Sequence, residues 1–186
     1  MPTLLEWLGQ AVSSPAWQAY VSEKSVEQRC YPDICYYNIR QDGVSFQVDP
    51  ATQKILTIDL YNSQARWGAF PHYPLEITIR GSNGATFVLP ITPTTTAIEL
   101  VRTLGEPSRK GGGDAGGTTA RALGPAMWTE WACLSKIGLS DSLTPLYLLA
   151  EYGGEAARAK DRWEPGRGSE ARWATIALSI VPPRAA

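Results

Sequence analysis

Histidine is almost absent from this sequence, since His72 is the only one among 186 residues. A metal site built from several imidazole groups is therefore excluded, and a serine or cysteine nucleophile would have to use this one side chain as its base. The patterns Ser-x-x-Lys, Gly-x-Ser-x-Gly, His-Glu-x-x-His and Cys-x-x-Cys do not occur either. We expect no metal, no cofactor and no catalytic residue. A pair of carboxylates still leaves an enzymatic activity open.

Long apolar runs and blocks of basic residues are also absent. No stretch approaches the ~18 apolar residues of a membrane-spanning helix, and 17 basic residues nearly balance 18 acidic ones. We therefore expect no transmembrane segment and no nucleic-acid partner. The N-terminus has no basic segment ahead of its apolar residues, which Glu6 interrupts early. This pattern argues against a signal peptide and favours a cytoplasmic protein.

Cysteine is scarce, with three residues at positions 30, 35 and 133. An odd count without a secretion signal is typical of reduced thiols in a cytosolic protein, which is what we expect here. Cys30 and Cys35 would meet only if the turn at Tyr31-Pro32-Asp33 brought them face to face. Whether they ever pair stays open from the sequence.

The most informative positive feature is a pattern that occurs twice. A capping-box spacing, Thr3 with Glu6 and later Thr96 with Glu99, starts a short helix each time. Segments of period-two alternation follow each helix, as expected for half-buried strands. The first three are 34–39, 44–49 and 55–61, and the second three are 127–134, 146–152 and 172–180.

These patterns predict an α+β fold made of tandem helix-plus-antiparallel-meander units, with a sheet and its helices packed on one face. We place the first unit at residues 1–93 and the second at 94–186, together forming one compact domain. A further hairpin, 75–80 with 86–89, is expected at the end of the first unit.

Two further helix boundaries can be predicted. Ser14-Pro15 combines an N-cap serine with proline at the first helical position, and we expect that helix to run to about Gln28. The helix that begins near Thr96 should end at Gly105, because glycine readily takes the left-handed conformation and Pro107 blocks continuation.

Glycine is concentrated in one segment, since seven of the 17 lie between residues 105 and 124. We predict a mobile loop at 109–121, because such a run buries too little surface to offset its chain entropy. Gly112 to Gly117 has the span of a P-loop, but Thr118 stands where the phosphate-binding lysine would be. A flexible connection is the better interpretation, and a functional role of the loop stays open.

Tryptophan is abundant, and four of the seven lie after residue 125. Trp128 and Trp131 are three apart on a predicted strand, so one indole should be in the core and the other outward. Because aromatic and arginine side chains together favour interface centres, we predict an aromatic rim for binding. Core filling is the competing interpretation of these residues. The candidate binding residues are Trp128, Trp131, Trp163, Trp173, Arg109, Lys110 and Arg167.

Two resemblances to known families follow from short motifs. Tyr36-Tyr37-Asn38, the strand Gly43–Asp49 and the following segment resemble the phagosome assembly factor family over roughly residues 33–79. Leu104-Gly105-Glu106-Pro107 is similar to the helix-ending Leu-Gly-x-Pro of tandem helix-plus-sheet modules, such as the β-lactamase-inhibitory-protein and outer-membrane assembly lipoprotein types. These resemblances imply a non-enzymatic scaffold with a concave sheet that binds another protein. The chain is much shorter than the phagosome family, and no binding residue carries over.

The sequence therefore favours a non-enzymatic protein-interaction or scaffold module that binds a partner protein through its sheet face and aromatic rim. The alternative is a small-molecule-binding protein or enzyme with a pocket between the two units, closed by the glycine-rich loop. A homo-oligomer stays open, as does peripheral membrane contact through Arg109, Lys110 and the arginines of 158–172.

Overall fold

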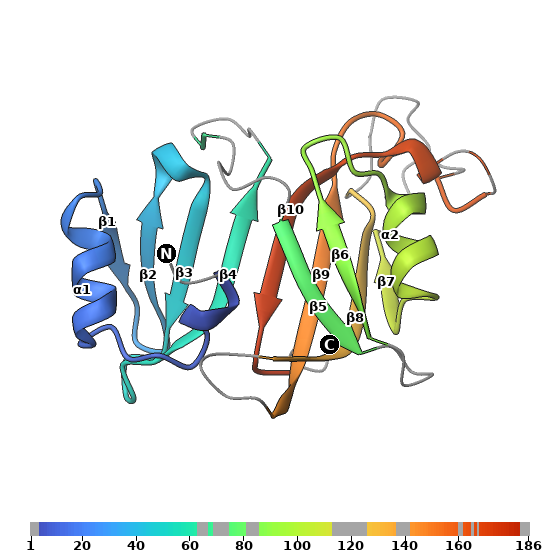
Figure 1. Cartoon of the computed structure of the whole chain (residues 1–186). Coiled ribbons are helices and arrows are strands. Elements are labelled where there is room, and N and C mark those ends of the chain that lie inside the picture. Colours follow the sequence, from blue (N-terminus) through green and yellow to red (C-terminus); the bar gives the residue numbers. More distant parts are fainter. Residues whose placement is uncertain are drawn as a thin grey trace.

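The chain adopts an α+β fold in which an antiparallel sheet carries helices on one face (Figure 1). This computed structural model describes residues 4–62, 67–68, 75–80, 86–112, 126–136, 142–159, 162–164, 166 and 168–182. The helices of these residues are α1 (Pro15–Ser22), α2 (Ala97–Leu104) and the 3-10 turns η1 (Leu4–Trp7), η2 (Arg40–Asp42) and η3 (Gly168–Glu170). No helix among them has both the length and the apolar character needed to cross a membrane.

Ten strands of the described residues form one sheet in the order β1-β2-β3-β4-β10-β9-β8-β5-β6, with β7 also paired to β8. The sheet consists of two meanders, β1–β4 and β8–β10. They join in the middle of the sheet, where β4 pairs with β10. The strands are β1 (Glu27–Cys30), β2 (Cys35–Ile39), β3 (Val44–Val48), β4 (Ile55–Tyr61), β5 (Leu75–Arg80), β6 (Thr86–Ile91), β7 (Arg109–Gly111), β8 (Trp128–Lys136), β9 (Leu143–Tyr152) and β10 (Trp173–Ser179).

The predicted helix starts at Ser14 and Thr96 are confirmed. The Ser14 side chain accepts a hydrogen bond from the backbone N–H of Trp17 at 3.3 Å. Glu99 closes the capping box of α2 by accepting from the backbone N–H of Thr96 at 2.7 Å. Gly105 ends α2 with a φ of 82°, a conformation that favours glycine. Near the N-terminus, Leu4–Trp7 form only the 3-10 turn η1, and Thr3 lies outside the described residues.

Two predicted boundaries are wrong. α1 ends at Ser22 rather than near Gln28, because Glu27–Cys30 pair with β2 as an edge strand. Those residues are polar and give a continued helix little to bury. The segment at Arg109–Gly111 forms strand β7 against β8 instead of starting a loop. The remainder of the predicted loop, 113–121, lies outside the described residues.

One line of opposed residues shows which face of the sheet carries the core. Residues directly opposite in antiparallel strands point to the same side. The line runs Phe46, Ile58, Leu178, Leu148 and Trp131, all buried, from β3 to β8.

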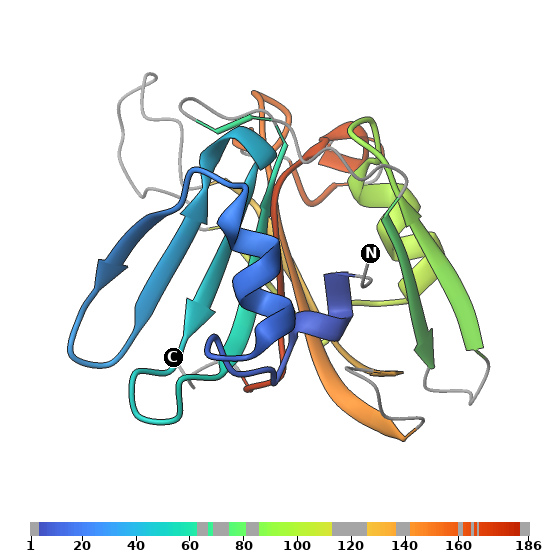
Figure 2. The same cartoon turned by 60° about the vertical axis from the view of Figure 1, so that its left-hand side comes forward.

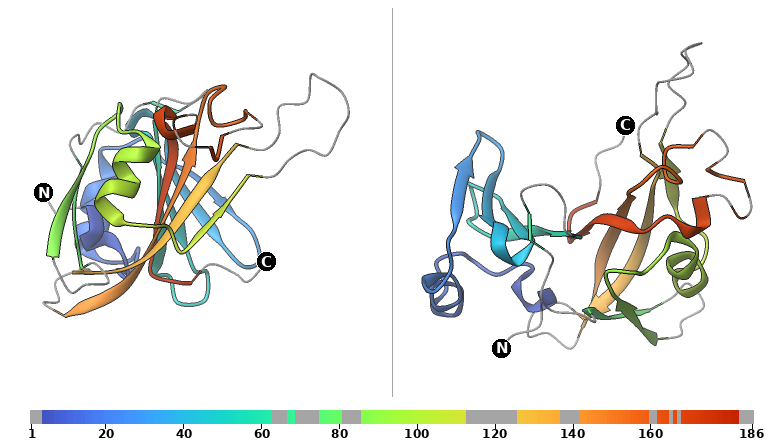
Figure 3. Two further views of the ribbon diagram at one scale, coloured as in Figure 1. Left: turned by 90° about the vertical axis from the view of Figure 1, so that its right-hand side faces the viewer. Right: turned by 90° about the horizontal axis from the view of Figure 1, so that it is seen from above.

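Both helices lie on that face. Trp17 of α1 packs edge-on against Phe46, with ring centroids 4.8 Å apart. At the other end, the indole N–H of Trp131 donates to the carbonyl of Gly105, directly after α2, at 2.9 Å. Figure 2 shows α1 and η1 lying across the strands of this face. The opposite face, which we call the open face, carries no helix of the described residues (Figure 3).

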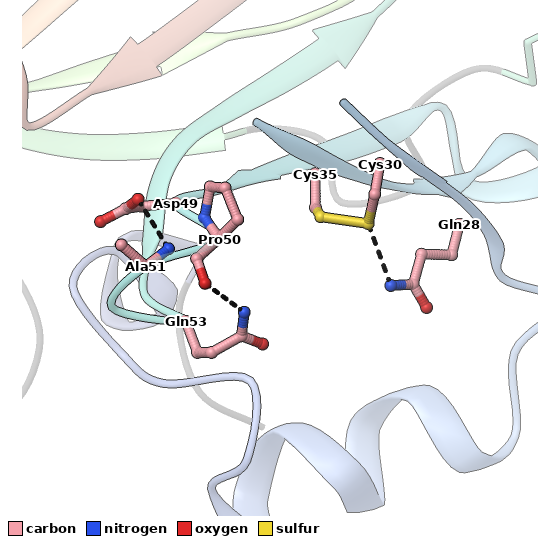
Figure 4. The surroundings of a disulfide bond; sticks show 7 residues. All are labelled: Gln28, Cys30, Cys35, Asp49, Pro50, Ala51 and Gln53. Carbon is pink, nitrogen blue, oxygen red and sulfur yellow. Dashed lines mark hydrogen bonds between the residues drawn. A yellow bond between two sulfur atoms is a disulfide. The ribbon is translucent and has the colours of Figure 1, made fainter. Parts of the chain in front are cut away.

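A disulfide bond links Cys30 and Cys35, which corrects the expectation of reduced thiols (Figure 4). The two residues are the last opposed pair of the β1–β2 hairpin, with Cα atoms 4.0 Å apart. The backbone N–H of Tyr31 donates to the carbonyl of Ile34 at 2.8 Å and closes the turn between them. Hairpin register therefore brings the thiols together, and Cys133 is the free cysteine.

Candidate functional site

The open face is organised in three rows of side chains that cross the strands. The central row runs Ser45, Asp59, Ala177, Leu149 and Glu130 across β3, β4, β10, β9 and β8. One flanking row consists of Tyr61, Thr175, Glu151 and Trp128. The other consists of Tyr36, Gln47, Thr57, Ser179 and Tyr147. Alanine and leucine thus form a small apolar floor surrounded by polar and aromatic side chains.

A hollow of about 490 Å³ lies on this face and reaches from β2 to β8. Tyr36 and Tyr147 contribute aromatic rings to its lining, while Asp33 and Glu130 contribute carboxylates. Val181 and Pro182, which follow β10, form part of its wall. No lysine or arginine belongs to the described lining of the hollow. The site is therefore a concavity with tyrosine and carboxylate walls.

Asp59 is the most perturbed acid of the open face. Only 8% of its surface is exposed, and it accepts a hydrogen bond from the Gln47 side-chain amide at 2.7 Å. Burial raises the pKa of its carboxyl to about 6, and the nearby Glu151 carboxylate adds to this rise. A carboxylate buried beside an amide, without an ion pair to a described cation, costs stability when it is charged. Such groups concentrate at functional sites.

Glu130 is the second buried acid of the central row, with 4% of its surface exposed. Arg109 of β7 lies opposite it, with Nη1 3.7 Å from a carboxylate oxygen. The Arg109 guanidinium also lies 5.8 Å from the centre of the Trp128 ring. Two of the predicted binding residues, Arg109 and Trp128, therefore meet at one edge of the open face.

Gly111 permits this close packing at the β7 edge. A Cβ atom at Gly111 would lie 2.5 Å from the Trp128 indole, much closer than van der Waals contact. The φ angle of this glycine is not in the left-handed region, so the requirement is one of space. β7 thus reaches β8 because the residue opposite Trp128 has no side chain.

An aromatic stack at the β4 end of the face was not predicted. The rings of Tyr61 and Trp67 are parallel within 9° with centroids 3.9 Å apart. The Arg40 guanidinium lies 4.9 Å from the Trp67 ring centre, and its Nε donates to Glu27 at 2.6 Å. Burial and the nearby Asp59 carboxylate raise the pKa of Tyr61 to about 12. In the sequence, the alternation of residues 55–61 already placed Thr57, Asp59 and Tyr61 on one side of a strand. This alternation was the signal from which Tyr61 could have been assigned to the open face.

Two of the predicted rim tryptophans belong to the core instead. Trp131 and Trp173 are 2% and 1% exposed. Their indole N–H groups donate to backbone carbonyls, Trp131 to Gly105 at 2.9 Å and Trp173 to Thr92 at 2.7 Å. Both face the helices, so neither can contact a partner at the surface. The prediction that Trp128 and Trp131 point to opposite faces is confirmed.

The other predicted binding residues lie apart from the open face. Trp163 is 42% exposed, and the Lys110 ammonium lies 5.7 Å from its ring centre. Lys110 is opposite Thr129 and therefore points to the helix side. Its ammonium also pairs with Glu106 at 3.1 Å. Arg167 and His72 lie outside the described residues.

Two further cavities border the second half of the chain. A cleft of about 820 Å³ is lined by Asn62 and Pro93 together with residues of the segments 151–158 and 170–174. A pocket of about 450 Å³ lies between α2 and the segment 162–170. Within the described part of the chain, no three His, Cys, Asp or Glu side chains are grouped so that they could hold a metal ion.

Comparison of the chain with protein-family models, with curated proteins and with solved structures finds no match in any of the three. The functional argument therefore depends on the geometry of the open face.

Proposed function

We propose that this chain is a non-enzymatic protein-interaction module that binds a partner protein through the open face of its sheet. The supporting observation is the hollow that spans β2 to β8 with tyrosine and carboxylate walls and no helix of the described residues over it. Six strand spacings of about 4.8 Å make the surface from β1 to β8 roughly 29 Å wide. With strands about 17–20 Å long, its area is roughly 500–600 Å², which is smaller than the roughly 800 Å² that one partner contributes to a standard interface and fits a small one.

Tandem helix-plus-meander units are part of this proposal. α1 precedes the meander β1–β4, and α2 precedes β7–β10, which gives the two halves a similar order of elements. A proposed boundary near residues 93 and 94 follows the β5–β6 hairpin. The similarity to modules of the β-lactamase-inhibitory-protein type is consistent with this order. The phagosome-family segment, 33–79, corresponds to β2–β5, and no binding residue is carried over from that resemblance.

The proposal is tested by affinity capture from native cell extract with a variant of the hollow. Tyr36→Ala combined with Tyr147→Ala removes two aromatic walls of the hollow that are only partly buried. We expect this variant to lose a stoichiometric protein that the wild type retains. Trp163→Ala is the matched control, because it removes an exposed aromatic from the helix side. Loss of the partner with Trp163→Ala alone would contradict the assignment of the open face.

The second candidate function is a small-molecule-binding protein or enzyme that uses the cleft of about 820 Å³. Asn62 and Pro93 from the first half and Arg158 and Arg172 from the second half contribute to its lining, as a pocket between the units requires. Retention of a metabolite without any protein in the same capture experiment would favour this function over the interaction module.

A further inference from the structure

Three carboxylates surround the apolar floor of the open face. Asp59 is opposite Ala177, and Glu130 is opposite Leu149. Glu151 lies two residues along β9 from Leu149 and is exposed. Neighbouring strands are about 4.8 Å apart, so each acid lies within one or two residue spacings of the floor.

The cations of the open face do not balance these acids. Arg109 is 3.7 Å from Glu130 at the β8 edge. Arg29 and Arg40 both pair with Glu27 at the opposite edge of the sheet. Neither Asp59 nor Glu151 forms an ion pair with a cation of the described residues. Among the described residues, the acids in the middle of the face therefore exceed the cations, and an arginine or lysine of a partner would complement them.

Building on the proposed function, we propose that the partner presents a positively charged segment to the open face and that an arginine side chain of this segment enters the hollow. Glu130 lines the hollow, and Asp59 and Glu151 lie beside its floor. These carboxylates can accept charge-assisted hydrogen bonds, which are the stronger kind. The rings of Tyr36 and Tyr147 line the same hollow, and planar guanidinium groups stack on aromatic faces. Arginine satisfies both kinds of contact, whereas lysine satisfies mainly the first.

Direct titration with a defined probe tests this inference. The ¹⁵N-labelled full-length chain is titrated with hexa-arginine, hexa-lysine and hexa-glutamine peptides, and amide shifts are mapped on the structure. We expect hexa-arginine to bind most tightly, with the largest shifts on β4, β9 and β10. Hexa-glutamine should cause no saturable shift, because it lacks charge.

Matched charge-neutral variants separate this site from general attraction. Asp59→Asn combined with Glu151→Gln should weaken hexa-arginine binding by about tenfold or more, as expected for loss of charged hydrogen bonds. Glu23→Gln combined with Glu164→Gln is the matched control. It removes the same amount of charge, both residues are exposed, and neither lines the hollow. This control should change the affinity by less than about twofold.

Three results would overturn the inference: equal weakening by both double variants, shifts that map to the helix side, or equal binding of all three peptides. Binding of free guanidinium ion as tightly as hexa-arginine would also overturn it, since a small cation rather than a protein segment would then suffice. Failure here is distinguishable from failure of the proposed function. If the neutral variant still captures the protein lost by the tyrosine variant, the interaction module stands and only the basic segment is wrong.

Discussion

At the scale of single residues, Asp59 is the side chain whose presence is hardest to explain by a contribution to the stability of the fold. It is buried on the open face beside an amide, although an apolar residue or asparagine would occupy this position at lower free energy. Its neighbours Tyr61 and Glu151 belong to the same face and interact with it electrostatically. We therefore expect the negative charge of Asp59 to lower the stability of the fold and to favour binding of a positively charged partner.

Asp59→Asn should therefore stabilise the folded chain at alkaline pH. The folded pKa of about 6 exceeds the ordinary aspartate value of 3.8, so the folded state binds this proton more tightly than the unfolded state does. The free energy of unfolding then falls as pH rises from about 4 to about 6, by about 2–3 kcal/mol for a shift of two pH units. In urea unfolding, the free energy of unfolding of the variant should exceed that of the wild type by this amount at pH 8 but not at pH 4.

The partly buried Asp49 provides a control of opposite sign. Hydrogen bonds from the Thr52 side chain and the Ala51 backbone lower the pKa of Asp49, so its contribution to stability is present above the unfolded pKa and lost at lower pH. Asp49→Asn should destabilise the chain at pH 8 and have less effect as pH falls through the Asp49 pKa. An Asp59→Asn variant that is destabilised equally at both values of pH would contradict the assigned burial.

Gly111 gives a second residue-scale prediction, because its role is steric. Gly111→Ala places a methyl group within 2.5 Å of the Trp128 indole. We expect a loss of about 1–3 kcal/mol in the free energy of unfolding, as for other overpacked sites. In a Trp128→Ala background the same substitution should cost almost nothing, which a double-mutant cycle would measure. Equal costs in both backgrounds would show that the indole is not the obstacle.

At the scale of elements, strands were easier to predict than the surfaces that they form. Alternation placed Val44–Val48 and Ile55–Tyr61 correctly, and capping residues placed the starts of α1 and α2. β1 was missed because Glu27–Cys30 lack alternation and form a strand only through pairing with β2. The open face was hidden because its rows join β4 to β10 and β9 to β8, and pairing between distant segments is not written in local periodicity.

The β1–β2 hairpin carries an element-scale prediction about its disulfide. Only five positions separate Cys30 from Cys35, so a loop-entropy estimate gives at most about 2 kcal/mol of stabilisation. Four opposed pairs already fix the hairpin register. We expect a reducing agent to lower the melting temperature of the wild type by no more than about 4–8 °C. A Cys30→Ser, Cys35→Ser double variant should melt at the reduced value with or without the agent.

Thiol titration provides the independent check on this bond. Under non-reducing denaturing conditions, the wild type should expose one thiol, that of Cys133. Burial raises the pKa of the Cys133 thiol to about 11, so the folded chain should react slowly at neutral pH. Three reactive thiols in the denatured, unreduced protein would show that Cys30 and Cys35 are not bonded.

At the scale of the whole molecule, the two faces of the sheet differ in composition and packing. The helix side buries a continuous core that includes Trp17, Phe46, Trp131 and Trp173. The open side keeps tyrosines and carboxylates around a hollow of about 490 Å³. The abundance of tryptophan thus serves mainly the core, and the proposed interaction surface consists of tyrosine and acidic residues that were less conspicuous in the sequence.

The most direct test of this account is site-specific photo-crosslinking in the native cell. The photoreactive amino acid benzoylphenylalanine replaces Tyr147 in the hollow or, as the control, Val88 of β6, which is 48% exposed and lies outside the open-face rows. We predict that position 147 crosslinks to one protein in high yield and that position 88 does not. Crosslinking from position 88 but not from position 147 would contradict the claim that the open face is the binding surface.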